Sequence, residues 1–142
     1  MDSWKKFLPE FEIVRWDESN FDVNAIPYTR EAYAVGKYAF VSDYARFWIL
    51  YHTGGVYFDT DVEVIKNIDD VLSKGNFLGV EQQNDEIITV APGLGIGVTP
   101  GNPLFGQMLE VYSRAHFLND DGTPCLKNFV EITTEQLQKY MI

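Results

Sequence analysis

The sequence has little cysteine and little positive charge, and each shortage excludes a class of protein. Cys125 is the single cysteine among 142 residues, which excludes an internal disulfide framework and every multi-cysteine metal site. Lys and Arg number 11 against 21 Asp and Glu, giving a net charge of −10. Because binding to nucleic acid requires clustered basic residues, we expect no nucleic-acid partner.

Long apolar runs are also missing. No stretch approaches the roughly 20 apolar residues of a membrane-spanning helix, and no signal-peptide-like apolar segment follows the first residues. We therefore expect no transmembrane segment and a cytoplasmic location, with peripheral association with a membrane as the alternative. Hydrophobic residues make up 46% of the sequence and aromatic residues 15%, enough for the core of a single domain over residues 1–142.

The hydrophobic spacing predicts both helices and strands, and hence an α/β domain. The clearest helix is predicted over Tyr38–Thr53, ending at Gly54. Strands are predicted at 11–16, 56–64, 77–80 and 87–90. Other helices are predicted up to Pro9, over 28–35 and 68–74, and from about 133. Asn102 is predicted to cap a further helix that begins at Pro103 and runs to about 116, and the glycines of 93–97 mark an irregular loop.

Asp59 and Asp61 lie two residues apart at the end of the predicted strand 56–64, after a Gly-Gly turn. In an extended chain, side chains at i and i+2 point the same way, so this pair could hold one divalent cation. Mg²⁺ and Mn²⁺ both suit oxygen ligands, and the sequence does not separate them. Two carboxylates are an incomplete shell that suits a metal shared with a diphosphate. The alternative is two acids on a solvated strand edge.

Asp43 and Arg46 are spaced i, i+3 on the helix that precedes this strand. They share one face, beside the apolar stripe of the helix. Asp43 could accept hydrogen bonds from sugar hydroxyls, and Arg46 could donate to a hydroxyl or a phosphate oxygen. The alternative is a surface ion pair of small energetic value.

These residues belong to a longer pattern with fixed spacing. Ser42-Asp43-Tyr44-Ala45-Arg46, followed by Gly54-Gly55-Val56-Tyr57-Phe58-Asp59-Thr60-Asp61, resembles glycosyltransferase family 32. That family comprises DXD-containing sugar transferases, including capsular-polysaccharide enzymes and mannosyltransferases. The block is also similar to the glucosyltransferase domain of large clostridial toxins. Residues 4–21 and 95–112 resemble the bacterial members of the family as well.

The resemblance implies a GT-A-like fold, in which a Rossmann-like mixed sheet is flanked by helices. It implies a nucleotide-sugar donor (UDP- or GDP-sugar), Mn²⁺ or Mg²⁺, a glycan acceptor, and transfer with retention of anomeric configuration. By this resemblance Asp43 and Arg46 contact the donor sugar, and Tyr57 lies near the diphosphate or sugar. Asp59 bridges donor and metal, and Asp61 is the direct metal ligand. No residue is implied as a nucleophile.

The sequence departs from the family at two places, and two other functions compete. The family's opening P-K-x-I-H-x-x-W strand and its C-terminal His and Trp have no counterpart, so we expect a domain truncated at both ends. A non-catalytic nucleotide-sugar-binding module is therefore the first alternative. The second is a haloacid-dehalogenase-like phosphatase with Asp59 as nucleophile and Asp61 as general acid. Its pattern requires Thr or Val where this sequence has Glu63.

Overall fold

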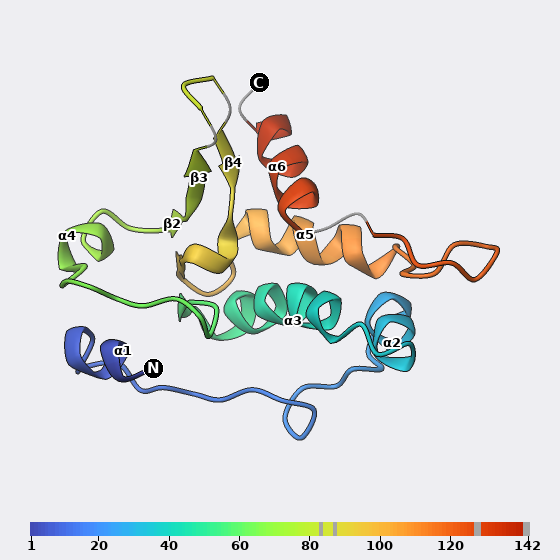
Figure 1. The fold of residues 1–142 in the computed structure, drawn as a ribbon, viewed down its shortest axis with the longest axis horizontal. Helices are drawn as coiled ribbons and strands as arrows, with labels where there is room; N and C mark the ends of the chain where they lie inside the picture. Colours follow the sequence, from blue (N-terminus) through green and yellow to red (C-terminus); the bar gives the residue numbers. More distant parts are fainter. Residues whose placement is uncertain (83, 87, 127–128, 141–142) are drawn as a thin grey trace.

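The computed structural model describes residues 1–82, 84–86, 88–126 and 129–140 and combines helices with short strands (Figure 1). The helices are α1 (Asp2–Phe7), α2 (Pro27–Ala34), α3 (Tyr38–Thr53), α4 (Asp69–Leu72), the 3₁₀ helix η1 (Pro92–Leu94), α5 (Pro103–Ser113) and α6 (Phe129–Tyr140). The strands are β1 (Gly55–Tyr57), β2 (Phe77–Leu78), β3 (Val80–Gln82), β4 (Ile88–Val90) and β5 (Ile96–Val98). The mixed α/β content is as predicted. Within the described ranges, no helix has the length and apolar character needed to cross a bilayer.

The strands form two small antiparallel sheets. In the first, β5 lies between β1 and β2, so Gly97 pairs with Val56 on one side and with Phe77 on the other. The second sheet is the hairpin of β3 and β4. Figure 1 shows this hairpin and α6 standing on one side of a layer formed by α3 and α5. Strand β1 follows α3, and β5 precedes α5. The pairing of β1 with β5 therefore brings the end of α3 close to the start of α5.

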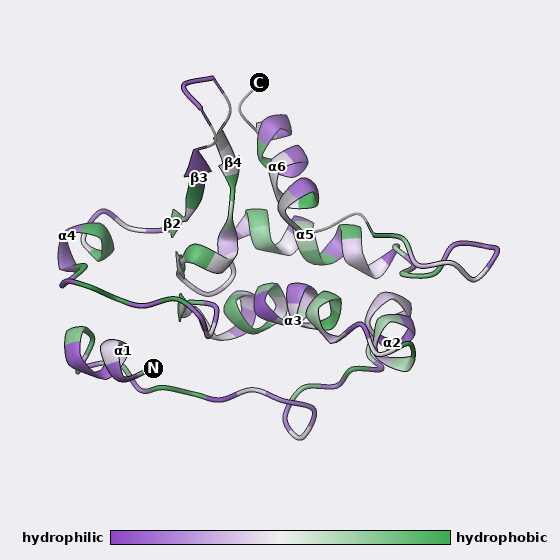
Figure 2. Ribbon diagram, viewed as in Figure 1, coloured by the Kyte–Doolittle hydropathy of each residue, from purple (hydrophilic) through white to green (hydrophobic). Residues whose placement is uncertain are grey.

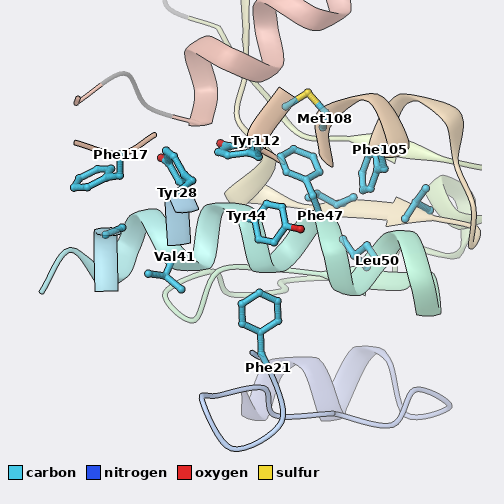
Figure 3. Close-up of a cluster of buried hydrophobic side chains, with 13 residues drawn as sticks. Phe21, Tyr28, Val41, Tyr44, Phe47, Leu50, Phe105, Met108, Tyr112 and Phe117 are labelled. Carbon is cyan, nitrogen blue, oxygen red and sulfur yellow. The ribbon is translucent and has the colours of Figure 1, made fainter. Parts of the chain in front are cut away.

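The core is largely aromatic and lies between α3 and α5. Phe47 of α3 and Phe105 of α5 meet edge to face, with ring centres 5.0 Å apart. Tyr28 of α2 meets Tyr112 of α5 in the same way at 4.9 Å, and Phe21 points up toward α3 from the segment that precedes α2 (Figure 3). Figure 2 shows hydrophobic and hydrophilic residues alternating along α3 and α5, as expected for helices with one buried face.

Local signals predicted the helices well. Helix α3 has the predicted bounds and ends at Gly54, whose φ of 64° suits glycine. Helix α5 begins at Pro103, as predicted, and the Asn102 side chain accepts hydrogen bonds from the Leu104 and Phe105 N–H groups. Helix α6 begins at Phe129, earlier than predicted.

The predicted strand at 11–16 is wrong. These residues form no strand, and the backbone of residues 12–14 makes no hydrogen bond to any described residue. The side chains of Phe11, Ile13 and Val14 are 43%, 38% and 57% exposed. The alternating pattern suits a strand, but a strand also requires a neighbouring chain to pair with, and none lies beside it in the described ranges.

Two further predictions about strands need correction. The strand predicted at 56–64 ends at Tyr57, and a turn follows in which the Val62 N–H donates to the Asp59 carbonyl over 3.0 Å. The predicted irregular loop 93–97 instead includes the end of η1 and the first two residues of β5, the central strand of the first sheet. Gly97 suits that strand because a Cβ there would come within 2.2 Å of the Phe77 ring. The strand predicted at 87–90 is found at 88–90, and residue 87 lies outside the described residues.

Candidate functional site

The Arg46 side chain ties helix α3 to the turn that follows β1. It is 7% exposed, and its guanidinium donates to the Asp43 carboxylate over 2.9 Å and to the Asp59 carboxylate over 3.3 Å. Its Nε also donates to the Ser42 carbonyl within the same helix. One buried cation thus pairs with two carboxylates from different elements, a geometry suited to the forked guanidinium.

Tyr57, the last residue of β1, completes this group. Its hydroxyl donates to Asp59 Oδ1 over 2.6 Å, and the Arg46 guanidinium carbon lies 5.0 Å from its ring centre. We call Asp43, Arg46, Tyr57 and Asp59 the Arg46 cluster.

The local fold explains how the cluster assembles. Helix α3 ends at Gly54, where an added Cβ would come within 2.7 Å of the Pro100 side chain and 2.9 Å of its backbone nitrogen. The close approach and positive φ both require glycine there. The chain then reverses into β1, which brings Tyr57 and Asp59 back beside the α3 residues Asp43 and Arg46.

Two distant segments hold the turn that carries Asp59 and Asp61. The Asp59 N–H donates to the Gly93 carbonyl over 2.9 Å. From α1, the Trp4 indole N–H donates to the Val62 carbonyl over 2.9 Å, and its ring packs on Phe58 with centres 5.6 Å apart. The acidic turn is therefore fixed at both ends by residues remote in sequence.

Burial controls the ionisation of the cluster. It raises the pKa of the Asp43 carboxyl from 3.8 to about 6; the nearby charge of Asp59 adds to this shift, and Arg46 opposes it. Burial also raises the pKa of the Tyr57 hydroxyl, although Arg46 opposes that shift, so Tyr57 stays a neutral donor to Asp59. The Asp59 side chain is 40% exposed, against 14% for Asp43. The cluster therefore opens to solvent on the side of Asp59.

Asp61 lies outside the cluster. It is exposed, and no hydrogen bond or ion pair joins it to another described residue. Asp59 and Asp61 were predicted to share one face of an extended strand; this prediction is wrong, because both lie in the turn. No group of three or more His, Cys, Asp or Glu side chains suited to a metal occurs among the described residues. Two hard carboxylate donors fit a divalent cation only where other ligands complete its shell.

A cavity of about 410 Å³ is lined by residues of α2, α3 and the segment that precedes α2, and it was not predicted from the sequence. Ser42, which precedes Asp43, lines it together with residues of α2, α3 and the segment 16–23. Its aromatic lining includes Trp16, Tyr33 and Tyr38, and the two tyrosine rings lie 5.2 Å apart. The aromatic residues are evident in the sequence, but their meeting around one cavity could not be predicted. It depends on how the irregular segment 16–23 crosses α3.

The structure brings together four of the five residues singled out in the sequence. Asp43, Arg46, Tyr57 and Asp59 form one hydrogen-bonded group, and Asp61 lies two residues along the same turn. The ion pair of Asp43 and Arg46 is buried, so the alternative of a surface pair is wrong. Their roles toward a ligand remain predictions. The contributions of Gly93 and Trp4 were missed, because no local pattern marks a contact between distant segments.

Comparisons with known proteins give two matches. The model of a family described as the glycosyltransferase sugar-binding region containing DXD motif matches residues 1–78. The chain is also similar to a solved structure described as PaToxG glycosyltransferase, with a TM-score of 0.53 and 21% identity. That similarity covers 84% of this chain and 42% of the other, so this chain spans less than half of its length. No curated protein matches.

These matches bear on the fold and on the competing functions. At 21% identity the structural likeness shows the fold alone, and it agrees with the predicted GT-A-like architecture. Neither match is to a phosphatase, so the haloacid-dehalogenase alternative gains no support.

Replacing Arg46 tests the energetic importance of the cluster. We expect Arg46→Ala to lower the free energy of unfolding by about 3–5 kcal/mol, because two carboxylates lose their buried partner. Arg114→Ala is the matched control, since Arg114 pairs with Glu110 at the exposed surface and should cost about 0–1 kcal/mol. Urea unfolding measures both. Equal losses in the two variants would contradict a central role for Arg46.

The raised pKa of Asp43 predicts a pH dependence of stability. Between pH 3.8 and about 6 the folded state binds this proton more tightly than the unfolded chain, so the contribution of Asp43 to stability falls as pH rises. Asp43→Asn removes that titration. Its stability relative to wild type should therefore improve by up to about 3 kcal/mol from pH 4 to pH 7. Urea unfolding in metal-free buffer measures this, and a pH-independent difference would refute the prediction.

Proposed function

The chain belongs to the family of glycosyltransferase sugar-binding regions that contain a DXD motif, and on that premise we propose that its Arg46 cluster binds a nucleotide-sugar together with a divalent cation. The observation that carries this proposal is the convergence of Asp43, Tyr57 and Asp59 on one buried guanidinium. Asp59 joins this cluster to the acidic turn.

The charges around the cluster support a metal-dependent site. Two carboxylates, on Asp43 and Asp59, pair with the guanidinium of Arg46, and a third, on Asp61, lies two residues along the same turn. A diphosphate approaching this turn would be repelled unless a cation arrived with it. Asp59 and Asp61 are the residues that would hold Mn²⁺ or Mg²⁺, which would supply charge neutralisation for a leaving diphosphate.

We assign the sugar to the α3 side of the cluster. Asp43 is nearly buried and already accepts from Arg46, so its position is fixed before a ligand arrives. A carboxylate held in this way can accept hydrogen bonds from sugar hydroxyls. Tyr57 and Arg46 likewise hold the Asp59 carboxylate in place. The fixed geometry reduces the entropic cost of ordering these groups when the donor binds.

The aromatic cavity is our candidate for the base of the donor. Ser42 lines this cavity, and the next residue along α3 is the cluster member Asp43. Planar rings such as Trp16, Tyr33 and Tyr38 offer surfaces on which a nucleobase can stack. UDP- and GDP-sugars both suit this assignment.

We propose transfer with retention to a glycan acceptor, as the resemblance to family 32 implies. The acceptor hydroxyl would attack the anomeric carbon while the bond to the diphosphate breaks, and the departing diphosphate would take the hydroxyl proton. The cluster suits this route because its carboxylates are engaged: Asp43 pairs with Arg46, and Asp59 with Arg46 and Tyr57. The protein would then act by positioning and by stabilising charge on the leaving group.

Donor binding by wild type, Asp61→Asn and Asp70→Asn tests the proposed function. Asp70 is the matched control, since it is an exposed aspartate on α4. We expect UDP- or GDP-sugars to stabilise the wild type only with Mn²⁺, by roughly 2.7 kcal/mol at 100 times the dissociation constant. Asp61→Asn should lose this stabilisation and Asp70→Asn should keep it.

The same thermal-unfolding experiment can refute the proposal. Stabilisation that persists in Asp61→Asn, or that needs no metal, would contradict the assigned site. No stabilisation of the folded wild type by any donor would contradict donor binding itself. The alternative of a non-catalytic binding module predicts metal-dependent binding without donor hydrolysis or transfer, which a turnover assay on the same samples distinguishes.

A further inference from the structure

Gly93, in the middle of η1, faces the Asp59 carboxylate directly. Its carbonyl accepts the Asp59 N–H over 2.9 Å. A Cβ added at Gly93 would lie 2.1 Å from Asp59 Oδ2, 2.8 Å from its Cγ and 3.4 Å from its Oδ1. All three atoms belong to the carboxylate of one residue of the Arg46 cluster. The space occupied by this carboxylate therefore exists because residue 93 has no side chain.

The other glycines in close contact have different neighbours. An added Cβ at Gly97 would meet the Phe77 ring, and one at Gly54 would meet Pro100. Those two glycines serve packing and chain reversal. Among the glycines of the described residues, an added Cβ would come into close contact with a carboxylate at Gly93 alone.

The backbone conformation of Gly93 does not itself require glycine, because its φ lies outside the positive range. Alanine could adopt this conformation, so its conflict would be with the Asp59 side chain alone. That side chain can rotate away while its N–H keeps its bond to the Gly93 carbonyl. Rotation would move Oδ1 away from the Arg46 guanidinium and the Tyr57 hydroxyl, which now donate to it over 3.3 Å and 2.6 Å. Gly93→Ala would therefore change the geometry of the site more than it would destabilise the fold.

We propose that Gly93 is a positioning residue, which sets the Asp59 carboxylate against Arg46 and Tyr57 and thereby prepares it for the cation and donor. The consequence for cation binding rests on the proposed function, whereas the positioning of Asp59 does not. The glycine-marked segment 93–97 thus contributes to the site through one missing side chain.

The first test needs no metal. In metal-free protein, the NMR resonances of the Arg46 guanidinium should move in Gly93→Ala and stay in place in Gly106→Ala. The control is a glycine of α5 whose added Cβ would approach only the Tyr51 ring, at 3.2 Å. In an Asp59→Ala background, Gly93→Ala should leave the Arg46 resonances unmoved, because the carboxylate that it displaces is gone.

The second test measures Mn²⁺ affinity by the electron paramagnetic resonance signal of free Mn²⁺. Gly93→Ala should weaken binding by about tenfold or more, as replacing a residue that supports a metal ligand commonly does. Gly106→Ala should bind like wild type. Added to Asp59→Ala, Gly93→Ala should cause no further loss.

Each outcome decides the proposal. Unmoved Arg46 resonances in Gly93→Ala, or an equal shift in the Asp59→Ala background, would overturn it. If the single variant fails to fold, folding of Asp59→Ala/Gly93→Ala supports the steric conflict, and failure of both variants overturns it. A wild type that binds no Mn²⁺ would refute the proposed function, while the metal-free comparison would still decide the role of Gly93.

Discussion

The buried guanidinium of Arg46 is the interaction on which the organisation of the site depends. A charge with so little exposure is costly unless partners surround it, and here Asp43 and Asp59 supply them from two elements. The pairing fixes how closely the turn after β1 approaches α3. It also gives Asp59 a defined position although that residue belongs to a half-exposed turn.

The scaffold serves this pairing in several ways. The aromatic contacts between α3 and α5 hold the helix that carries Asp43 and Arg46. Gly54 allows the reversal into β1, and pairing of β1 with β5 places Tyr57 opposite Ile96. Trp4 and Gly93 secure the acidic turn from outside. Helix packing, a glycine reversal and two long-range hydrogen bonds thus produce one arrangement of charge.

Local and long-range information differ in how well the sequence predicts them. The bounds of α3 and the start of α5 were predictable because an apolar stripe, a glycine end and an Asn-Pro cap are local signals. The residues of the Arg46 cluster were predictable because a fixed-spacing motif contains them. The early end of β1 at Tyr57 could not be predicted, because the alternating polarity of 56–64 suits both a long strand and a short strand followed by a turn. The role of Gly93 could not be predicted, since it depends on what packs against an absent side chain.

The cation and donor site is tested most directly by locating the residues at which Mn²⁺ binds in solution. Substoichiometric Mn²⁺, added with a nucleoside diphosphate to ¹⁵N-labelled wild type, broadens the amide signals nearest the ion. We expect the amides of residues 59–62 and 93 to broaden first. Earlier broadening at the acidic residues of α4 or of the turn 119–122, or no selective broadening at all, would contradict the claim that the Arg46 cluster and its acidic turn form the cation and donor site.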